Sequence, residues 1–343
     1  MNKKYILALL ICFILLLSAC SKKSGTPTGS APRTPFIGGT SGVTVTFLKD
    51  NPPPEVTDEE SFAFQSIVRL KNDGEFKVTK NNVKVNLVGF DPSDFGQTFD
   101  DLKNVEPTDE LDSKKRDAEG NIIDGTESYA TFPKSGADFI PTKFVGNIPF
   151  TFRADVCYNY GTQSLAKICV LRDMINVRDD SICKPTGLGT SGRQVYSSSG
   201  PVQVTNFKQS VQGKDKISFS FDVVLSSKVD VFWSKDERKP TTFDDGCPRD
   251  PKTRRQAENQ VGVEITEIPN DPIFVNVKCG GLDSNTKGVI RLVNSQRTVV
   301  CTADLVQDRL DLEKQVGVKL QYNVLDTKEA QVLVKHLAAE TNP

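Results

Sequence analysis

The sequence predicts an all-β protein built from two tandem β-sandwich domains. Apolar and polar residues alternate with a period of two over much of the chain, which is the pattern of half-buried strands. Turn residues interrupt this alternation roughly every ten residues, as they do in sandwiches of short antiparallel strands. Six cysteines remain beyond the N-terminal leader, and an even number of cysteines in an exported chain indicates disulfides.

The N-terminus has the features of a leader that directs export. Lys3 and Lys4 precede an apolar run at 5–17, and the run closes on Leu-Ser-Ala-Cys at 17–20. This order of charge, short apolar core and small residues resembles a lipoprotein signal peptide with its lipobox. Cleavage before the cysteine would leave Cys20, acylated on its sulfur, as the first residue of the mature chain. We therefore expect Cys20 to be lipidated and to anchor the protein at the extracytoplasmic face of the cell membrane.

Two other interpretations of the leader are weaker. The segment from Tyr5 to Ala19 is shorter than the roughly 20 residues that a membrane-spanning helix needs. An ordinary secretory peptide would not explain the stretch at 20–40, which is rich in Ser, Gly, Pro and Thr. We therefore assign residues 1–19 to a lipoprotein signal peptide and residues 20–40 to a flexible tether.

Composition limits the class of partner. Lysine and arginine number 43 against 44 aspartates and glutamates, and no basic stripe is present, which argues against nucleic acid. The 20 phenylalanines and a hydrophobic content of 37% are sufficient to form cores after the tether.

The cysteines predict as many as three disulfides. Cys12 leaves with the signal peptide, and Cys20 is the acylation site. A zinc site is less favoured because the chain has no Cys-x-x-Cys motif and a single histidine, His336. The disulfide candidates are Cys157, Cys169, Cys183, Cys247, Cys279 and Cys301.

Six cysteines allow 15 pairings, and the sequence alone does not choose among them. The best-guess pair is Cys279 with Cys301, because these residues flank a unit of two expected strands. For Cys183, both Cys157 and Cys169 stay open as partners.

The first sandwich is expected at 41–183. Alternation is clear in the runs that begin at Val43, Phe62 and Val83. The stretch at 91–145 is different because it is acidic and loop-like, and we interpret it as a long insertion between strands. Alternation then resumes from residue 149 to residue 160.

The second sandwich is expected at 201–335. A Gly- and Ser-rich linker at 184–200 marks the boundary between the domains. Beyond it, a long strand rich in phenylalanine spans 216–225, in the place where the first half has a similar strand, so the two halves share a layout. Residues 336–343 are expected to form a loose C-terminal tail.

Part of the first half resembles a known family. Residues 62–74 form an alternating strand that ends in Asn-Asp-Gly, similar to the second strand and turn of CARDB-like domains. That family consists of immunoglobulin-like sandwiches in exported prokaryotic proteins. The resemblance implies two tandem immunoglobulin-like (CARDB-like) β-sandwich domains, although the equivalent strand at 216–225 lacks the turn.

The mature layout is also similar to that of uncharacterised surface lipoproteins of archaea. The shared elements lie at 89–92, 157–160, 201–205 and 288–294. This resemblance implies a surface location and supplies no catalytic residue.

No recognisable catalytic set is present in the sequence. Ser-His-Asp and Cys-His arrangements need a histidine base, and His336 lies in the polar C-terminal stretch, where we expect it to be solvated. The acidic stretch at 91–145 offers oxygen ligands for calcium, but the spacing of Asp91, Asp94 and Asp100 matches no EF-hand loop. We favour a solvated acidic loop, and we expect no catalytic, cofactor or metal site.

These observations predict a non-catalytic binding or scaffold module. Lipid on Cys20 would hold it at the membrane, and loops or strand edges on a rigid frame would recognise an extracellular protein or glycan. Two alternatives stay open. One is a structural subunit of a cell-surface assembly, and the other is a hydrolase that uses paired carboxylates of the acidic stretch.

Overall fold

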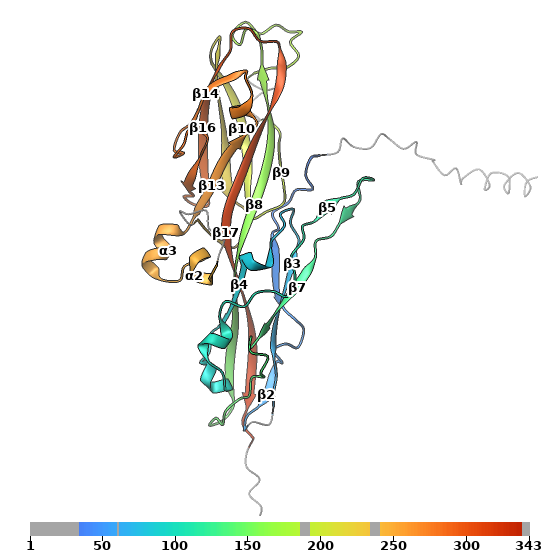
Figure 1. The fold of residues 1–343 in the computed structure, drawn as a ribbon, viewed down its shortest axis with the longest axis vertical. Coiled ribbons are helices and arrows are strands. Elements are labelled where there is room, and N and C mark those ends of the chain that lie inside the picture. The colour runs from blue at the N-terminus through green and yellow to red at the C-terminus, as the bar shows by residue number, and fades with distance from the viewer. Residues whose placement is uncertain (1–33, 60–61, 186–192, 234–240, 338–343) are drawn as a thin grey trace, which may run out of the picture. The chain divides into compact units, whose positions relative to one another are not determined.

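The computed structural model of the chain describes residues 34–59, 62–185, 193–233 and 241–337. Antiparallel strands dominate this part of the chain and helices are short (Figure 1), so the all-β prediction is confirmed. The helical elements are η1 (Lys80–Asn82), η2 (Pro92–Phe95), η3 (Phe99–Leu102), α2 (Phe243–Gly246), α3 (Pro251–Ala257) and η4 (Ile268–Asn270).

The strands form three larger sheets and one hairpin. The three-stranded sheet has the order β1 (Val43–Phe47), β3 (Ser66–Asn72), β7 (Glu127–Phe132). The four-stranded sheet has the order β10 (Val202–Gly213), β11 (Lys216–Leu225), β16 (Gln296–Leu305), β14 (Phe274–Cys279). The hairpin consists of β5 (Lys115–Arg116) and β6 (Ile122–Ile123).

The largest sheet has eight strands. Its main path is β15 (Lys287–Arg291), β13 (Gln260–Thr266), β17 (Leu312–Lys335), β8 (Ile148–Val170), β4 (Val83–Val88). Three short strands join at its margins: β12 (Asp230–Phe232) and the parallel β2 (Glu55–Thr57) pair with β17, and β9 (Val195–Ser197) pairs with β8.

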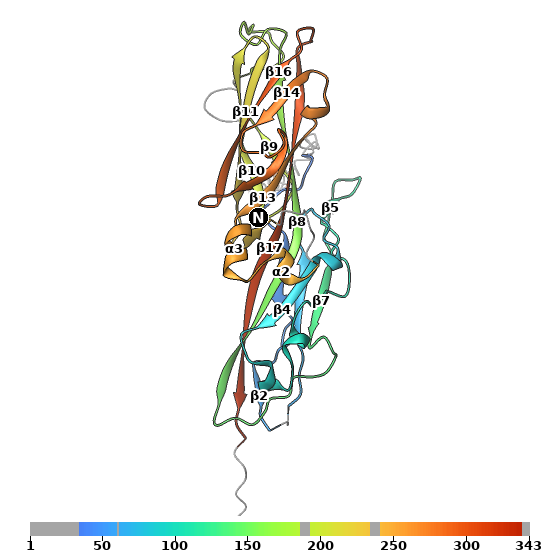
Figure 2. The same ribbon diagram turned by 60° about the vertical axis from the view of Figure 1, so that its left-hand side comes forward.

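Two long strands run through the whole of the largest sheet. β8 has 23 residues and β17 has 24, and they pair antiparallel from Ile148 opposite Val334 to Val170 opposite Leu312. The three-stranded sheet lies beside one end of this pair, and the four-stranded sheet lies beside the other end (Figures 1 and 2). We call β8 and β17 the long strand pair.

The alternation of buried and exposed residues along the strands shows which face of the sheet meets the core. Along β17, Val316, Val318 and Leu320 are buried, whereas Lys319 between them is exposed. Successive side chains of a strand point to opposite faces, so one face of the long strand pair meets the smaller sheets and the other faces outward. Aromatic clusters fill both halves of the core, with Phe64, Phe95, Phe139 and Phe152 in one half and Phe207, Phe219 and Phe221 in the other.

The division of the chain differs from the expected one. β8 belongs to the expected first domain (41–183) and β17 to the expected second domain (201–335), yet the two strands pair along their whole length. Residues 35–343 form one compact unit. Alternation reveals a strand but not its partner, so the pairing of β8 with β17 could not be predicted from the sequence pattern. Of the expected linker at 184–200, residues 186–192 lie outside the described residues.

The acidic stretch at 91–145 is part of the core, and its interpretation as an inserted loop was wrong. β7 lies within it and supplies a strand of the three-stranded sheet. Its apolar residues Phe95, Leu111 and Phe139 are fully buried. These apolar residues are irregularly spaced among turns and do not alternate with polar residues. The sequence pattern therefore did not reveal them as core residues.

The last residues of the expected tether are bound to the fold. The backbone N–H groups of Ile37 and Gly38 each donate a 2.8 Å hydrogen bond to the carboxylate of Glu75. Residues 35–40 are therefore part of the folded unit, while residues 20–33 of the expected tether lie outside the described residues.

The start of the expected C-terminal tail is also bound to the fold. The Nδ1 atom of His336 lies 2.7 Å from Oδ2 of the buried Asp58, and the His336 side chain is only 27% exposed. The N–H of Leu337 donates to the other oxygen of Asp58. His336 is thus a partner of a buried carboxylate rather than the solvated residue expected from its position near the chain end.

Candidate functional site

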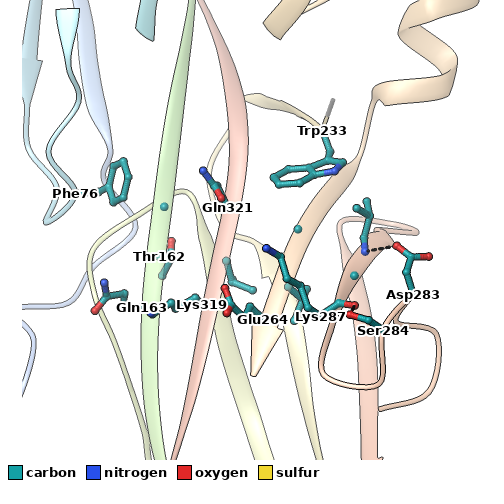
Figure 3. Close-up of a pocket in the computed structure, with 16 residues that line it drawn as sticks. Phe76, Thr162, Gln163, Trp233, Glu264, Asp283, Ser284, Lys287, Lys319 and Gln321 are labelled. Carbon is teal, nitrogen blue, oxygen red and sulfur yellow. Dashed lines mark hydrogen bonds between the residues drawn. The ribbon is translucent and has the colours of Figure 1, made fainter. Parts of the chain in front are cut away.

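A groove crosses four neighbouring strands on the outer face of the largest sheet (Figure 3). Strand pairing places Gly161, Gln321, Gly262 and Val289 in one row across β8, β17, β13 and β15. The adjacent row consists of Gln163, Lys319, Glu264 and Lys287. All eight residues occupy outward positions, because successive side chains of a strand point to opposite faces and the alternate positions point inward. Those alternate positions are buried at Thr162 in β8, Leu320 in β17, Val263 in β13 and Ile290 in β15.

Two glycines allow aromatic rings to lie against this sheet. A Cβ atom at Gly161 would stand 2.7 Å from Cε2 of Phe76, and one at Gly262 would stand 2.7 Å from Cη2 of Trp233. Real Cβ atoms do not approach that closely, so any other residue would displace the ring. Phe76 and Trp233 therefore form two aromatic walls on opposite sides of the Gln321 side chain (Figure 3).

Phe76 is held by its backbone and by its ring. Asn72, at the end of β3, donates from Nδ2 to the carbonyl of Phe76 at 2.8 Å and to that of Leu111 at 3.0 Å. The N–H of Phe76 lies 3.4 Å from the hydroxyl of Tyr160, and the two rings are 5.3 Å apart between centroids. Burial of Tyr160, on the core side of β8, fixes this wall against the long strand pair.

Trp233 follows β12 and is held by the segment that contains α2 and α3. Its backbone N–H donates a hydrogen bond to the carbonyl of Ala257 at 3.1 Å. Arg291 in β15 donates to the carbonyls of Gln256 at 2.8 Å and Glu258 at 2.9 Å, which fixes the end of α3. Trp233 is only 8% exposed and lines the groove, so it acts as a rigid wall.

The loop before β15 closes the far side of the groove. Asp283 accepts a 3.3 Å hydrogen bond from the N–H of Val289, and Ser284 accepts one from the N–H of Lys287 through its carbonyl. These bonds hold the Asp283 and Ser284 side chains at the rim (Figure 3).

The groove has a volume of about 400 Å³ and a chemically mixed lining. Lys319 and Lys287 provide ammonium donors, Glu264 and Asp283 provide carboxylate acceptors, and Gln163 and Gln321 offer both functions. The two positive and two negative groups balance in charge. The lining therefore suits a ligand with many neutral donors and acceptors and an apolar surface for the two rings.

The six predicted cysteines form three disulfides. Cys279 is bonded to Cys301, the pair expected from the sequence, and joins β14 to β16. Cys169 is the partner of Cys183, which settles the choice left open for Cys183. Cys157 is bonded to Cys247 across 90 residues, a pairing that spacing alone did not suggest. Cys20 lies outside the described residues.

The Cys157–Cys247 disulfide belongs to a small apolar cluster on the outer face of the long strand pair. Phe232, Phe243 and Leu325 complete this cluster, and Ala257 packs against it. The disulfide therefore fixes the α2–α3 segment, whose Ala257 carbonyl accepts a hydrogen bond from the backbone N–H of Trp233.

The carboxylates of the acidic stretch serve local structure. Hydrogen bonds from the hydroxyl and N–H of Ser93 lower the pKa of Asp91, and the side chain of Asn121 lowers that of Asp117. Burial, reinforced by the charge of Asp91, raises the pKa of Asp94. Within the described residues, no group of three or more His, Cys, Asp or Glu side chains is arranged to hold a metal ion.

The sequence analysis did not identify the groove, although the sequence contains a signal for it. Glycine inside a strand weakens it and marks a close approach of another group. Gly161 and Gly262 interrupt alternating strands and lie beneath Phe76 and Trp233. The pairing of β8, β17 and β13, which brings these glycines into one row, is set by long-range contacts that the local pattern does not encode.

The comparisons with known proteins do not reveal a family. No family model and no curated protein matches the chain. Among solved structures, the secreted serine protease VesC from Vibrio cholerae matches with a TM-score of 0.18 and 9% identity over 87% of this chain. The match spans 52% of that protein's length, and a likeness at this level carries no argument about function. Within the described residues, no helix has the length and apolar character of a membrane span.

Proposed function

We propose that this chain is a lipid-anchored, extracytoplasmic binding module without catalytic activity, and that its groove holds part of a carbohydrate chain. The observation that carries the proposal is the combination of two aromatic walls with a floor of amide, carboxylate and ammonium groups on one rigid sheet. The leader and Cys20 support the location, and three disulfides are typical of an oxidising, extracytoplasmic compartment.

The chemistry of the lining favours a carbohydrate. A sugar ring has an apolar C–H face and a rim of hydroxyl groups. Rigid aromatic side chains supply contact area for the apolar face at a low cost in conformational entropy. The hydroxyl groups both donate and accept hydrogen bonds, which matches the mixed floor formed by residues such as Gln321, Lys319 and Glu264.

The geometry of the groove favours a chain of linked rings. Gly161 and Gly262, which carry the aromatic walls, lie two strands apart in one row. Adjacent strands are separated by about 4.8 Å, so the two wall positions are about 10 Å apart, which is more than one ring needs. An extended peptide is expected at an unpaired strand edge instead, because its backbone hydrogen bonds are made there, whereas this groove lies on a sheet face.

The position of the single histidine supports a non-catalytic role. Lys319 lies in the groove, and His336 follows the last residue of the same strand, Lys335. Sixteen residues of strand separate Lys319 from Lys335, which corresponds to about 50 Å. The groove therefore has no imidazole base within reach for acyl-transfer chemistry.

The experiment that tests this function uses the full-length, lipidated protein in detergent. An immobilised panel of tetrasaccharides identifies a bound member, and calorimetry then measures its Kd. Phe76→Ala is expected to weaken binding by about tenfold, because loss of an aromatic contact is worth about 1 kcal/mol or slightly more. Trp233→Ala is expected to have an effect at least as large.

A matched variant separates binding from folding. Phe99 is 70% exposed and lies outside the groove, so Phe99→Ala removes a ring and is expected to leave affinity unchanged. Far-ultraviolet circular dichroism and thermal unfolding check that each variant is folded. Failure of the native protein to bind any saccharide, together with ordered self-assembly, would favour a structural subunit instead.

A further inference from the structure

We propose that the groove continues past Phe76 into a basic side pocket, and that the bound carbohydrate therefore carries an anionic group, either a carboxylate or a sulfate. This inference rests on the proposed function, because it specifies which carbohydrates the groove accepts. It is carried by a second cavity whose lining is continuous with that of the groove.

The side pocket has a volume of about 330 Å³ and shares Phe76, Gly161 and Gln163 with the groove. The Phe76 ring lies between the two cavities, so a chain that stacks on it reaches both. The opposite wall comes from the β5–β6 hairpin and the residues just before it, at 113–116. The hairpin projects beside β8 and β9 (Figure 1).

The single carboxylate in the lining of the side pocket is already engaged by the fold. Glu75 accepts hydrogen bonds from three backbone N–H groups: Ile37 and Gly38 at 2.8 Å and Ser199 at 2.7 Å. Its acceptor capacity serves the fold, since it joins Ile37 and Gly38 to Ser199, which follows β9. A neutral hydroxyl-rich ligand would find little acceptor capacity from Glu75 here.

The cations of the side pocket are less constrained. Lys114 lies between Asp73 at 3.8 Å and Asp124 at 3.7 Å, so its charge is largely balanced. Lys115 and Arg116 are exposed, and neither forms an ion pair within the described part of the chain. With Lys114 balanced and the Glu75 carboxylate still negative, Lys115 and Arg116 leave the side pocket with a net positive charge of about one, whereas the charges of the groove cancel.

This distribution of charge determines the ligand class. A ligand with a neutral ring in the groove and an anionic ring one or two units along would place its charge beside Lys115 and Arg116. Arginine pairs with carboxylate or sulfate in a planar, bidentate geometry, which adds orientation as well as attraction. A nucleic acid would need a longer basic surface, and the charges in the adjacent groove do not provide one.

The test uses the full-length, lipidated protein in detergent and an immobilised panel of tetrasaccharides. Each backbone is present as a neutral, a carboxylated and a sulfated member. We expect the native protein to retain acidic members more strongly than their neutral counterparts, by about fivefold to twentyfold at low salt. Comparison of the carboxylated and sulfated arms identifies which anion is recognised.

Substitution locates the selectivity. Lys115→Gln with Arg116→Gln is expected to abolish the preference for acidic members while retaining the affinity for neutral ones. Lys252→Gln, which removes an exposed cation of α3 outside both cavities, is expected to change neither. Raising the salt well above 0.1 M should reduce the preference, because exposed charges are screened over about 10 Å at that concentration.

The outcomes distinguish the two proposals. Equal retention of neutral and acidic members, unaffected by the double substitution, would overturn the inference and leave the proposed function standing. Retention of no saccharide at all would overturn both. Retention of acidic members that persists in the double variant but is lost in Phe76→Ala would exclude the side pocket as the source of selectivity.

Discussion

At the scale of single residues, the groove depends on two positions where the strand sequence departs from β-branched and aromatic residues. Glycine in a strand is destabilising by roughly 0.5–1 kcal/mol relative to alanine. At Gly161 and Gly262 this loss is offset by the packing of Phe76 and Trp233 directly on the sheet. The two glycines thus convert a flat outer face into a surface with walls.

Asp58 is a second position where one side chain organises several segments. It accepts hydrogen bonds from the N–H groups of Phe144 and Leu337 and lies against His336. Burial opposes its ionisation, but the bonds from His336, Leu337 and Phe144 outweigh that effect and lower the pKa of Asp58 to about 2. The carboxylate therefore joins the end of β17 to the segment before β8.

This shift predicts how stability depends on pH. A carboxyl group whose pKa is lower in the folded state stabilises the fold above its unfolded pKa, which is near 3.8. Its contribution is lost as the pH falls from about 4 towards 2. We expect Asp58→Asn to be less stable than the native protein at neutral pH, and the difference to shrink over that interval.

Urea unfolding at a series of pH values measures this difference. Asp179 is exposed and provides a matched control, because Asp179→Asn removes a carboxylate without removing a buried partner. A difference between Asp58→Asn and the native protein that stayed constant from neutral pH to pH 2 would contradict the assignment.

At the scale of elements, the α2–α3 segment is the support of the Trp233 wall. Its own helices are short, and a helix of this length has little stability in isolation. Its attachments to the fold include the Cys157–Cys247 disulfide, the hydrogen bonds from Arg291, and the contact of Ala257 with the apolar cluster around Phe232. Trp233 is therefore positioned by contacts that are remote in sequence.

Removal of this disulfide is expected to weaken ligand binding as well as stability. The double substitution Cys157→Ser with Cys247→Ser should lower the free energy of unfolding by about 2–5 kcal/mol. Because it also loosens the segment that holds Trp233, we expect the Kd for the bound saccharide to rise by about tenfold. Calorimetry and denaturant unfolding measure the two effects separately.

The Cys279–Cys301 disulfide supplies the control for this prediction. It joins β14 to β16 in the four-stranded sheet, which contributes no residue to the groove. Cys279→Ser with Cys301→Ser should therefore reduce stability and leave affinity unchanged. Equal losses of affinity in both double variants would mean that binding merely follows global stability.

At the scale of the whole molecule, the sequence predicted strands better than it predicted their partners. Alternation identified the strand around Val43 and the Phe-rich strand at 216–225, because one buried face is a local property. It did not reveal that β8 and β17 pair over their whole length, since pairing depends on residues more than 140 positions apart. The groove was missed for the same reason, because its rows exist only after β8, β17 and β13 are aligned.

The long strand pair has a consequence for folding. Separate sandwiches joined by a linker are expected to unfold independently, as multidomain proteins often do. Here each of the two long strands contributes to both halves, and their hydrogen-bonded ladder is continuous from Ile148–Val334 to Val170–Leu312. Disruption of one half therefore exposes strand edges and core residues of the other.

We accordingly expect a single cooperative thermal transition for residues 35–343. Val68 in β3 and Val223 in β11 are fully buried in opposite halves. Val68→Ala and Val223→Ala each leave a small cavity and should lower the free energy of unfolding by about 1–3 kcal/mol. Each is expected to lower the Tm of the same transition by about 2–8 °C, whichever half carries the substitution.

Differential scanning calorimetry, with near-ultraviolet circular dichroism as a second probe, tests this coupling. Lys278→Ala, at an exposed position of β14, is the control and should leave Tm unchanged. Two resolved transitions, with Val68→Ala moving one and Val223→Ala moving the other, would show that the halves are independent despite the shared strands. One transition that both substitutions move would show that the ladder between β8 and β17 transmits stability along its length, because neither valine lies in that ladder.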